Sequence, residues 1–463
     1  MSDFAVLGRT VGPQHPEIQT LLRQARDQQA RVLCLCRHPG VPMYIAAVGE
    51  ELIIKRMPNT GKDAVDCDRY ELPLALSGKA EILGQAIIED PASEAARLKL
   101  AFALTQGKAR QGSSGEGASH HTVKADPKKL TLRGLLDYLW EEAELTLMAP
   151  GFVGKRNWGL VRKFLWGAAD AKSSQKFQLR ELLFMPAMYS PEHKDRLAAD
   201  RVRAFAAAAK AKHKKIVIGI VKSLGPARFG GKLSIKHMPD AQLFMDEKMF
   251  RAVPKRFAAE FDLWRLHENS HLITIATVMQ MPSGILAIDE IGFMNVTESW
   301  IPFQHNDEKE LIEVLTGEHR RFVKTMRYNV VPSVPMAFGL LTDVDQQGTA
   351  LFVVPHDANE AVRAEFDHLI SSCELETGAG TQAAPGRRYR ANSSGFRLRP
   401  AGRLWNIDRT TEKPKRVRGC SCNWTQPGHK NREQAKDKMT AMIRCGWRGS
   451  VSATKRGRRL APP

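Results

Sequence analysis

The segment Ile216-Val-Ile-Gly-Ile-Val221 opens the part of the chain that decides the fold class. Its apolar, β-branched residues predict a buried strand, and helical patterns follow at about 246–266 and 307–316. Further strand-like segments occupy residues 232–236, 272–279, 285–296, 322–328, 338–342 and 350–354. Because strands and helices are interspersed, we predict an α/β domain over residues 216–375, in a multidomain protein of the mixed α+β class.

Residues 131–215, which precede this domain, are predicted to be helical. Their first helix has an apolar face formed by Leu132, Leu135, Leu136 and Leu139, which are spaced as a buried helix face requires. Two more helices are expected at about 157–171 and 191–212. The first two of these three helices could form a helix-turn-helix.

The first 130 residues are predicted to contain three segments. Residues 1–30 form an N-terminal extension with a short helix. Residues 31–106 alternate like short antiparallel strands and form a small β-rich module that contains cysteines. Residues 107–130 are rich in Gly, Ser, Lys and His, which indicates a flexible linker.

The net charge of +19 is concentrated near the end of the sequence. Residues 377–463 contain 21 Lys and Arg but only 4 Asp and Glu, and they have few residues that could build a core. We therefore predict a basic, disordered tail over residues 376–463. Two interpretations remain open: an arm that neutralises the phosphates of nucleic acid, or an out-of-frame product of a G+C-rich gene.

The composition also excludes some classes of protein. No apolar run approaches the roughly 18 residues of a membrane span, so no membrane partner is expected. The 7 cysteines are too few for a disulfide scaffold in a chain of this length, which favours reduced thiols and a cytoplasmic location.

Four residues near the N-terminus could hold a structural zinc ion. Cys34 and Cys36 lie two apart on an expected strand, so both thiols face the same side. His38 and Cys67 would complete a tetrahedral Cys/His site. The alternative is that these cysteines simply pack in a small core.

A basic arc on the second helix of the 131–215 region suggests contact with DNA. It contains Lys155, Arg156, Arg162 and Lys163 and lies beside an apolar arc, as in a helix that meets a DNA groove. A solvated basic face would give the same pattern.

Two short motifs resemble catalytic signatures but lack the required context. His267-Glu-Asn-Ser-His271 matches the zinc-peptidase pattern, yet a β-branched run follows it, so the helix is expected to end between the histidines. The glycine-rich segment 225–234 resembles a phosphate-binding loop, but a strand follows it where a helix N-terminus is needed.

A metal-dependent nuclease is the enzymatic alternative. Asp343 ends an expected strand after a helix that carries Glu308, Glu310 and Glu313, in the order of a restriction-type nuclease core. The next strand, at 350–354, contains neither an acidic residue nor a lysine. The second half of the magnesium site is therefore missing.

Several stretches resemble the bacterial family called domain of unknown function 1173 (DUF1173), over about residues 30–375. They are Cys34-Leu-Cys36, Met43-Tyr-Ile45, Lys55-Arg-Met-Pro58, Leu135-Leu-Asp-Tyr-Leu-Trp140, Thr297-Glu-Ser-Trp-Ile-Pro-Phe303, Arg321-Phe-Val-Lys324 and Leu341-Thr-Asp343. The family pattern has a His shortly before the third Cys, whereas residues 62–66 contain none. The resemblance implies an association with plasmids and integrating conjugative elements.

Our leading hypothesis is a cytoplasmic accessory protein of a mobile genetic element that associates with nucleic acid and is not an enzyme. Its candidate partners are DNA and other proteins of the element. The alternatives are the divergent nuclease around Asp343 and a protein–protein adaptor with a structural zinc module.

Overall fold

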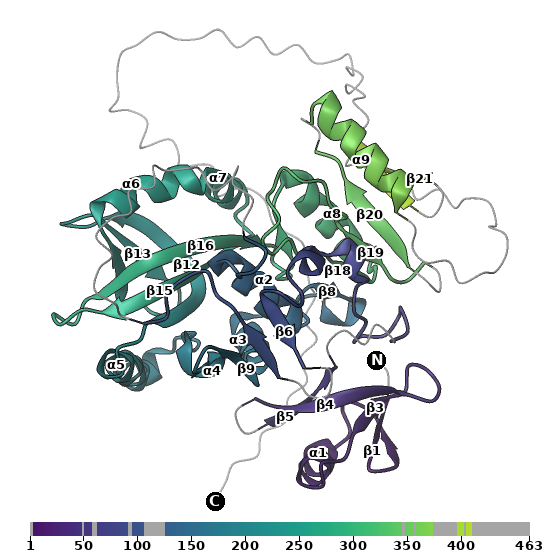
Figure 1. Cartoon of the computed structure of the whole chain (residues 1–463), viewed down its shortest axis with the longest axis horizontal. Coiled ribbons are helices and arrows are strands. Elements are labelled where there is room, and N and C mark those ends of the chain that lie inside the picture. The colour runs from purple at the N-terminus through teal and green to yellow at the C-terminus, as the bar shows by residue number, and fades with distance from the viewer. Residues whose placement is uncertain are drawn as a thin grey trace, which may run out of the picture. The chain divides into compact units, whose positions relative to one another are not determined.

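The computed structural model describes residues 3–48, 51–57, 63–90, 95–105, 126–344, 348–355, 358–373, 396–401 and 404–409. All of them belong to one compact unit, Met1–Thr411. These residues form helices and several sheets, which confirms the predicted mixed α+β class (Figure 1). The predicted linker at 107–130 and the predicted basic tail lie mostly outside the described residues.

The N-terminal sheet has the strand order β2-β1-β3-β4-β5, and neighbouring strands are antiparallel. Its strands are β1 (Phe4–Val6), β2 (Arg9–Val11), β3 (Val32–Cys34), β4 (Val41–Val48) and β5 (Glu51–Arg56). Helix α1 (Ile18–Asp27) packs on this sheet with Leu21, Leu22 and Ala25. The sequence predicted the helix but not β1 and β2, because three-residue strands carry too little alternation to detect.

A second small sheet joins this region to the middle of the chain. It has the order β10-β9-β7-β6, and β7 is parallel to β9. Its strands are β6 (Ile87–Glu89), β7 (Ala96–Leu98), β9 (Lys172–Ser174) and β10 (Phe177–Gln178), and the short helices nearby are η1 (Leu74–Leu76), η2 (Gly78–Glu81) and α4 (Leu179–Leu182).

Helix α2 (Leu132–Glu142) lies in the interior of the unit. The side chain of Thr131 caps it by accepting a hydrogen bond from the backbone N–H of Gly134, and nearly all of its residues are buried. The next helix, α3 (Trp158–Ala168), comes only after β8 (Leu147–Met148) and η3 (Pro150–Phe152). This connection is much longer than the three or four residues of a helix-turn-helix.

A network of buried charges ties α2 to the first two sheets. Lys79 has its Nζ 3.1 Å from a carboxylate oxygen of Glu89 and 3.8 Å from oxygens of Glu71 and Glu142. Lys172 is 3.4 Å from the other oxygen of Glu142. Because these ions are removed from water, each depends on its partners for compensation.

Five strands, including the three longest of the described residues, form a closed barrel. Its strands are β12 (Lys215–Pro226), β13 (Gly231–Ile235), β14 (Gln242–Met245), β15 (His271–Gln280) and β16 (Leu286–Val296). The pairings run β12-β13-β14-β16-β15 and return to β12, and the β14–β16 pair is parallel. Helices α6 (Glu247–Arg256) and α7 (Ala258–Leu266) connect β14 to β15.

The barrel closes because β12 pairs with two neighbours. Residues 215–220 pair with β15, and residues 221–226 pair with β13. A bulge between Val221 and Ser223 lies just after the point where β12 changes partner, and a bulge bends a strand. Gly219 allows the bend, since a Cβ at this position would lie 2.6 Å from Ile235.

The alternation of side chains in β12 and β15 places each strand between two cores. Val217, Val221 and Ala276 point into the barrel, and Ile218 and Ile275 pack against the core around α2 and α3. Both faces are therefore apolar, which explains the continuous hydrophobic runs in the sequence. Helix α5 (Lys194–Lys210), which follows η4 (Pro191–His193), packs on β15.

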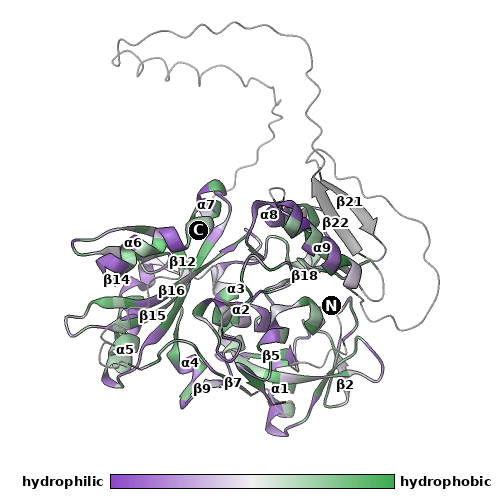
Figure 2. Cartoon of the chain, turned by 45° about the horizontal axis from the view of Figure 1, so that its top comes forward, coloured by the Kyte–Doolittle hydropathy of each residue, from purple (hydrophilic) through white to green (hydrophobic). Residues whose placement is uncertain are grey.

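The last sheet has the order β21-β22-β20-β19-β18-β8. Its strands besides β8 are β18 (Phe322–Lys324), β19 (Gly339–Leu341), β20 (Thr349–Val353), β21 (Phe396–Ala401) and β22 (Leu404–Arg409). The remaining elements are β11 (Leu183–Phe184), β17 (Pro302–Phe303), α8 (Asn306–Gly317) and α9 (Glu360–Ser372). Helices such as α5 and α8 carry both hydrophilic and hydrophobic colours in Figure 2, as expected for helices with one buried face.

Candidate functional site

Three cysteines and an aspartate form a group that could hold a metal ion. Cys34 ends β3, Cys36 lies in the turn after it, and Asp63 and Cys67 come from the segment before η1. One ligand atom from each of the four residues lies within 4.8 Å of the others. Cys34, Asp63 and Cys67 are buried.

Hydrogen bonds hold the sulfur atoms in place. The Sγ atoms of Cys34 and Cys67 are 3.6 Å apart, and the Cys36 thiol is 3.7 Å from Oδ1 of Asp63. Backbone N–H groups of Ala64 and Arg69 donate to Cys36 and Cys67. Such donors stabilise thiolates, the form that binds metal.

The environment shifts the pKa values of this group in different directions. A hydrogen bond from Cys67 lowers the pKa of the Cys34 thiol below its ordinary value. Burial raises the pKa of Cys36 and that of Asp63. A cation bound among these groups would reverse the effect of burial, because it stabilises the charged forms.

The fourth member of the group is Asp63, whereas the sequence prediction used His38. A carboxylate can take the place of a histidine as a zinc ligand. Asp63 lies four residues before Cys67, and this short spacing is the signal in the sequence that points to it. Its Oδ2 atom is buried without a hydrogen-bond partner among the described residues.

The four residues of the predicted basic arc lie in different environments. Arg156 donates to the backbone carbonyls of Leu145, Leu147 and Ser299, and burial lowers its pKa to about 10. Arg162 donates to the carbonyl of Met185, and Lys163 pairs with Glu51. Lys155 is exposed.

The carboxylates of the predicted nuclease site are each engaged by a different partner. Asp343 accepts two hydrogen bonds from the Arg320 guanidinium and one from the backbone of Arg321. The Glu308 carboxylate is 3.3 Å from Nζ of Lys324. Glu310 accepts a hydrogen bond from Asn306, and Glu313 pairs with Lys309. None of them belongs to the metal-competent group found among the described residues.

The histidines of the zinc-peptidase pattern lie on different elements. His267 follows the last residue of α7, and His271 begins β15. The helix thus ends at Leu266, before the first histidine, and the two histidines do not share a helix face. The glycine-rich segment 225–234 forms the end of β12, a short loop and the start of β13, as expected from the strand that follows it.

The outer face of β13 and β14 presents aromatic and cationic side chains. Phe229 lies in the loop between β12 and β13 and is 80% exposed, and the Arg228 guanidinium lies 5.4 Å from the centre of its ring. Lys232 is paired in register with Phe244. Both side chains are half-buried and lie outside the apolar cluster that fills the barrel.

The loop between β15 and β16 borders the same face. Its exposed apolar residues are Met281 and Ile285, and it ends where Leu286 pairs with Leu243 of β14. Residues 221–239 contain four Lys and Arg and no Asp or Glu. The face therefore combines rings for stacking with a local positive charge.

The loop between β12 and β13 depends on Gly230. Its φ of +74° is a conformation that L residues rarely adopt, and a Cβ there would lie 2.2 Å from the carbonyl oxygen of Met245. The glycine therefore lets this loop pass close to the end of β14.

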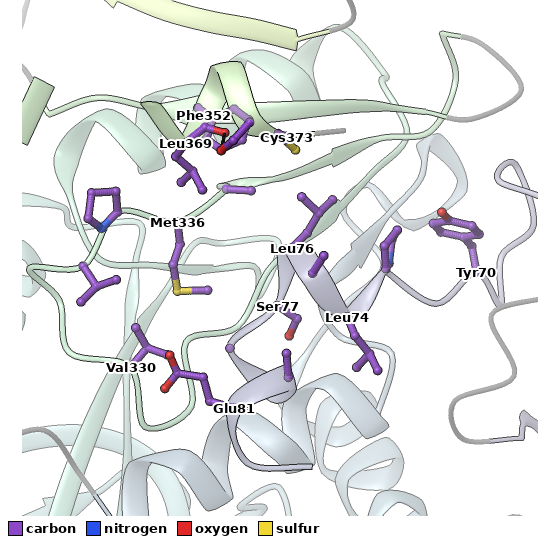
Figure 3. A pocket seen from close by; sticks show the side chains of 18 of the residues that line it. Tyr70, Leu74, Leu76, Ser77, Glu81, Val330, Met336, Phe352, Leu369 and Cys373 are labelled. Atoms are coloured by element: carbon purple, nitrogen blue, oxygen red, sulfur yellow. Dashed lines mark hydrogen bonds between the residues drawn. The ribbon is translucent and has the colours of Figure 1, made fainter. Parts of the chain in front are cut away.

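A cavity of about 980 Å³ is lined by Asp63 and extends toward α9. Figure 3 shows Leu74, Leu76 and Ser77 on one side and Met336 and Val330 on the other. Most of these side chains are apolar, and the cavity has no group of unpaired polar atoms that would define a ligand among the described residues.

The comparisons with known proteins give one match. The model of the family described as "Protein of unknown function (DUF1173)" matches residues 4–379. The chain belongs to this family. Neither the curated proteins nor the solved structures contain a significant match.

The match begins at the first residue of β1 and ends where the basic segment begins. The family region of this DUF1173 protein thus includes the N-terminal sheet, the metal-competent group and the barrel. None of the described helices is long and apolar enough to cross a membrane.

Proposed function

We propose that this DUF1173 protein is a non-enzymatic accessory protein of a bacterial mobile genetic element and that it binds single-stranded nucleic acid through the β13–β14 face of its barrel. The association with a mobile element rests on the sequence resemblance. The binding of nucleic acid rests on the topology of the barrel and on the side chains of this face.

The single observation that carries the proposal is the strand order of the barrel. Counted from β12, the strands pair in the order 1-2-3-5-4-1, with helices between the third and fourth strands. This is the arrangement of the OB-fold barrels. They bind oligonucleotides or oligosaccharides on strands 2 and 3, between the loops 1–2 and 4–5.

The side chains favour nucleic acid, because a fold alone does not fix a function. Phe229 lies in loop 1–2, and Phe244 lies on strand 3 beside Lys232. Aromatic rings on such a face stack with bases, at about 1–3 kcal/mol per base, and cations track the phosphates. Bases in a duplex are already stacked on each other, so single strands are the better fit.

Fluorescence anisotropy with a labelled oligo-dT strand tests this proposal on the full-length protein. The double variant Phe229→Ala, Phe244→Ala is expected to bind at least tenfold more weakly, whereas the control Met188→Ala, an exposed side chain elsewhere, should bind like the wild type. The basic segment after residue 376 is present in all three proteins, so its contribution to the affinity cancels when they are compared. The proposal would be refuted if all three proteins bound the oligo-dT strand with equal affinity. A preference for duplex over single-stranded nucleic acid would also refute it.

We further propose that Cys34, Cys36, Cys67 and Asp63 bind a structural zinc ion. Three thiolates and one carboxylate are ligands that zinc accepts in a tetrahedral site. The four ligand atoms lie within 4.8 Å of one another, which is compatible with one ion at about 2.0–2.3 Å from each ligand. The zinc would join β3 to the segment before η1.

Metal analysis of the purified full-length protein tests the zinc proposal. One zinc per chain is expected for the wild type and for His38→Ala, and less than one for Asp63→Ala. Folded wild-type protein without metal after preparation in zinc-containing medium would overturn it. Loss of zinc in His38→Ala alone would replace Asp63 by His38 as the fourth ligand.

A further inference from the structure

A second cavity, of about 720 Å³, is lined by residues of α2, α7 and β16 and by segments next to β17 and β18. Its β16 residues lie between Glu290 and Asn295, whereas the β13–β14 face meets β16 at Leu286 and Ala287. The residues that line the cavity do not include any of β13, β14 or the loops beside them. The cavity therefore shares no lining residue with the proposed nucleic-acid face.

Three buried oxygen atoms in the lining have no hydrogen-bond partner among the described residues. They are Oδ1 of Asn295, Oε2 of Glu260 and Oε1 of Gln304. Asn295 is 2% exposed, and buried acceptors are nearly always paired, because an unpaired one costs about 1–3 kcal/mol.

The residues of the three acceptors line the same cavity. The Asn295 amide donates to the backbone carbonyl of Glu260 at 3.0 Å, which leaves its oxygen unused. Asn295 also pairs with Phe303 across β16 and β17, and Gln304 is the next residue. A ligand in this cavity would therefore meet several acceptors and would have to supply hydrogen-bond donors.

The rest of the lining supplies rings and cations. Phe257 and Phe303 line the cavity beside the acceptors, and Arg256 and Arg327 line it as well. The Arg327 guanidinium donates to the carbonyls of Val331 and Val334. Burial lowers its pKa, and the carboxylates of Glu308 and Asp137 oppose this effect. These two carboxylates also pair with Lys324 and Arg133. Three cations therefore share two carboxylates, which favours an anionic group on the ligand.

Asp137 also lines the cavity, but both oxygens of its carboxylate already accept hydrogen bonds. Its Oδ1 accepts from Arg133 at 2.8 Å, and its Oδ2 accepts from the backbone of Tyr328 at 3.0 Å. The acceptors available to a ligand are therefore those of Glu260, Asn295 and Gln304.

We propose that this cavity binds a guanine nucleotide, with the Watson–Crick edge of the base on Glu260, Asn295 and Gln304. Guanine is the base with two adjacent donors on this edge, the N1–H and the N2 amino group, and a carboxylate accepts both. Adenine, cytosine and uracil each place an acceptor beside their donor. The aromatic rings can stack on the base, the arginines can bind phosphate, and the volume is that of a small-molecule site.

Isothermal titration of the full-length protein with GMP, AMP, CMP and UMP tests this inference. GMP is expected to bind at least tenfold more tightly than the other three. Glu260→Gln should weaken GMP binding at least tenfold, because the amide offers one acceptor where the carboxylate offers two. The control Glu247→Gln, an exposed residue of α6, should leave it unchanged.

Two results would overturn the inference: equal affinity for the four nucleotides, or an affinity for GMP that Glu260→Gln does not change. If free GMP does not bind, the guanine could still come from a nucleic acid. The affinities for the oligonucleotides dTTGTT and dTTATT are then compared. A preference for dTTGTT that Glu260→Gln abolishes would place a guanine of a nucleic acid in the cavity. Absence of this preference would exclude guanine from the cavity. The variant Phe229→Ala, Phe244→Ala should keep its GMP binding, so the two proposals can fail separately.

Discussion

Replacing Lys79 by methionine removes one cation from the buried network between the N-terminal sheets and α2. Lys79 is 1% exposed, and its Nζ lies within 4 Å of the carboxylates of Glu71, Glu89 and Glu142. Methionine keeps most of the side-chain volume, so the cavity term is small. The carboxylates, in contrast, lose their shared counter-charge.

Removing one partner of a buried ion pair costs about 3–5 kcal/mol, and we expect a loss of this size in the free energy of unfolding at pH 7. It is a large fraction of the 5–15 kcal/mol that is typical of a folded domain. The defect should shrink toward pH 5. In the variant the carboxylates have raised pKa values, so they take up protons in the folded state as the pH falls.

Urea unfolding followed by circular dichroism measures this loss. The control Lys248→Met, at an exposed position of α6, should change the stability by less than about 0.5 kcal/mol. Adding Glu89→Gln to Lys79→Met should recover part of the loss, because it removes one uncompensated charge. A loss below about 1 kcal/mol, with no recovery in the double variant, would refute the role of Lys79 in holding this network together.

Three further predictions follow from individual residues. Burial raises the pKa of Glu142, but nearby cations, chiefly Lys172 and Lys79, lower it to about 2. The ionised carboxylate should therefore contribute on the order of 3 kcal/mol to the free energy of unfolding above pH 4.5. The difference in stability between the wild type and Glu142→Gln should vanish as the pH falls toward 2. Gly230→Ala should weaken oligo-dT binding several-fold, because the loop that carries Phe229 cannot keep its conformation; unchanged anisotropy would contradict this. Cys67→Ser should lower the melting temperature in calorimetry and make it insensitive to a chelator, whereas the wild type should lose stability when the chelator is added.

The elements of the barrel were largely predictable from the sequence. Segments 216–221, 232–236, 272–279 and 285–296 match β12, β13, β15 and β16 within about five residues at each end, because β-branched residues fit the buried, pleated surface of a strand. The sequence did not predict β14, which has only four residues. β14 pairs with both β13 and β16. Without it the predicted strands do not form a closed barrel, so the sequence did not predict the barrel.

The candidate sites were less predictable, because each depends on residues that are distant in the sequence. Arg156 is a residue type that is common in DNA contacts, but here its side chain donates to three backbone carbonyls. A helical projection shows which residues share a face and not what covers that face. The feature that distinguishes the β13–β14 face is the exposed ring of Phe229 beside Arg228. Whether a side chain is exposed depends on the folded chain and cannot be read from the sequence.

The sequence by itself determined the α+β class, the positions of most α-helices and of four of the five barrel strands, and three of the four members of the metal-competent group. These features follow from local patterns of hydrophobicity and from short spacings. The tertiary structure alone decided the fourth member, Asp63, the closure of the barrel through the β14–β16 pair, and the meeting of Glu260, Asn295 and Gln304 in one cavity. Such features arise when long-range packing brings separate segments together, and no local pattern records which segments will meet.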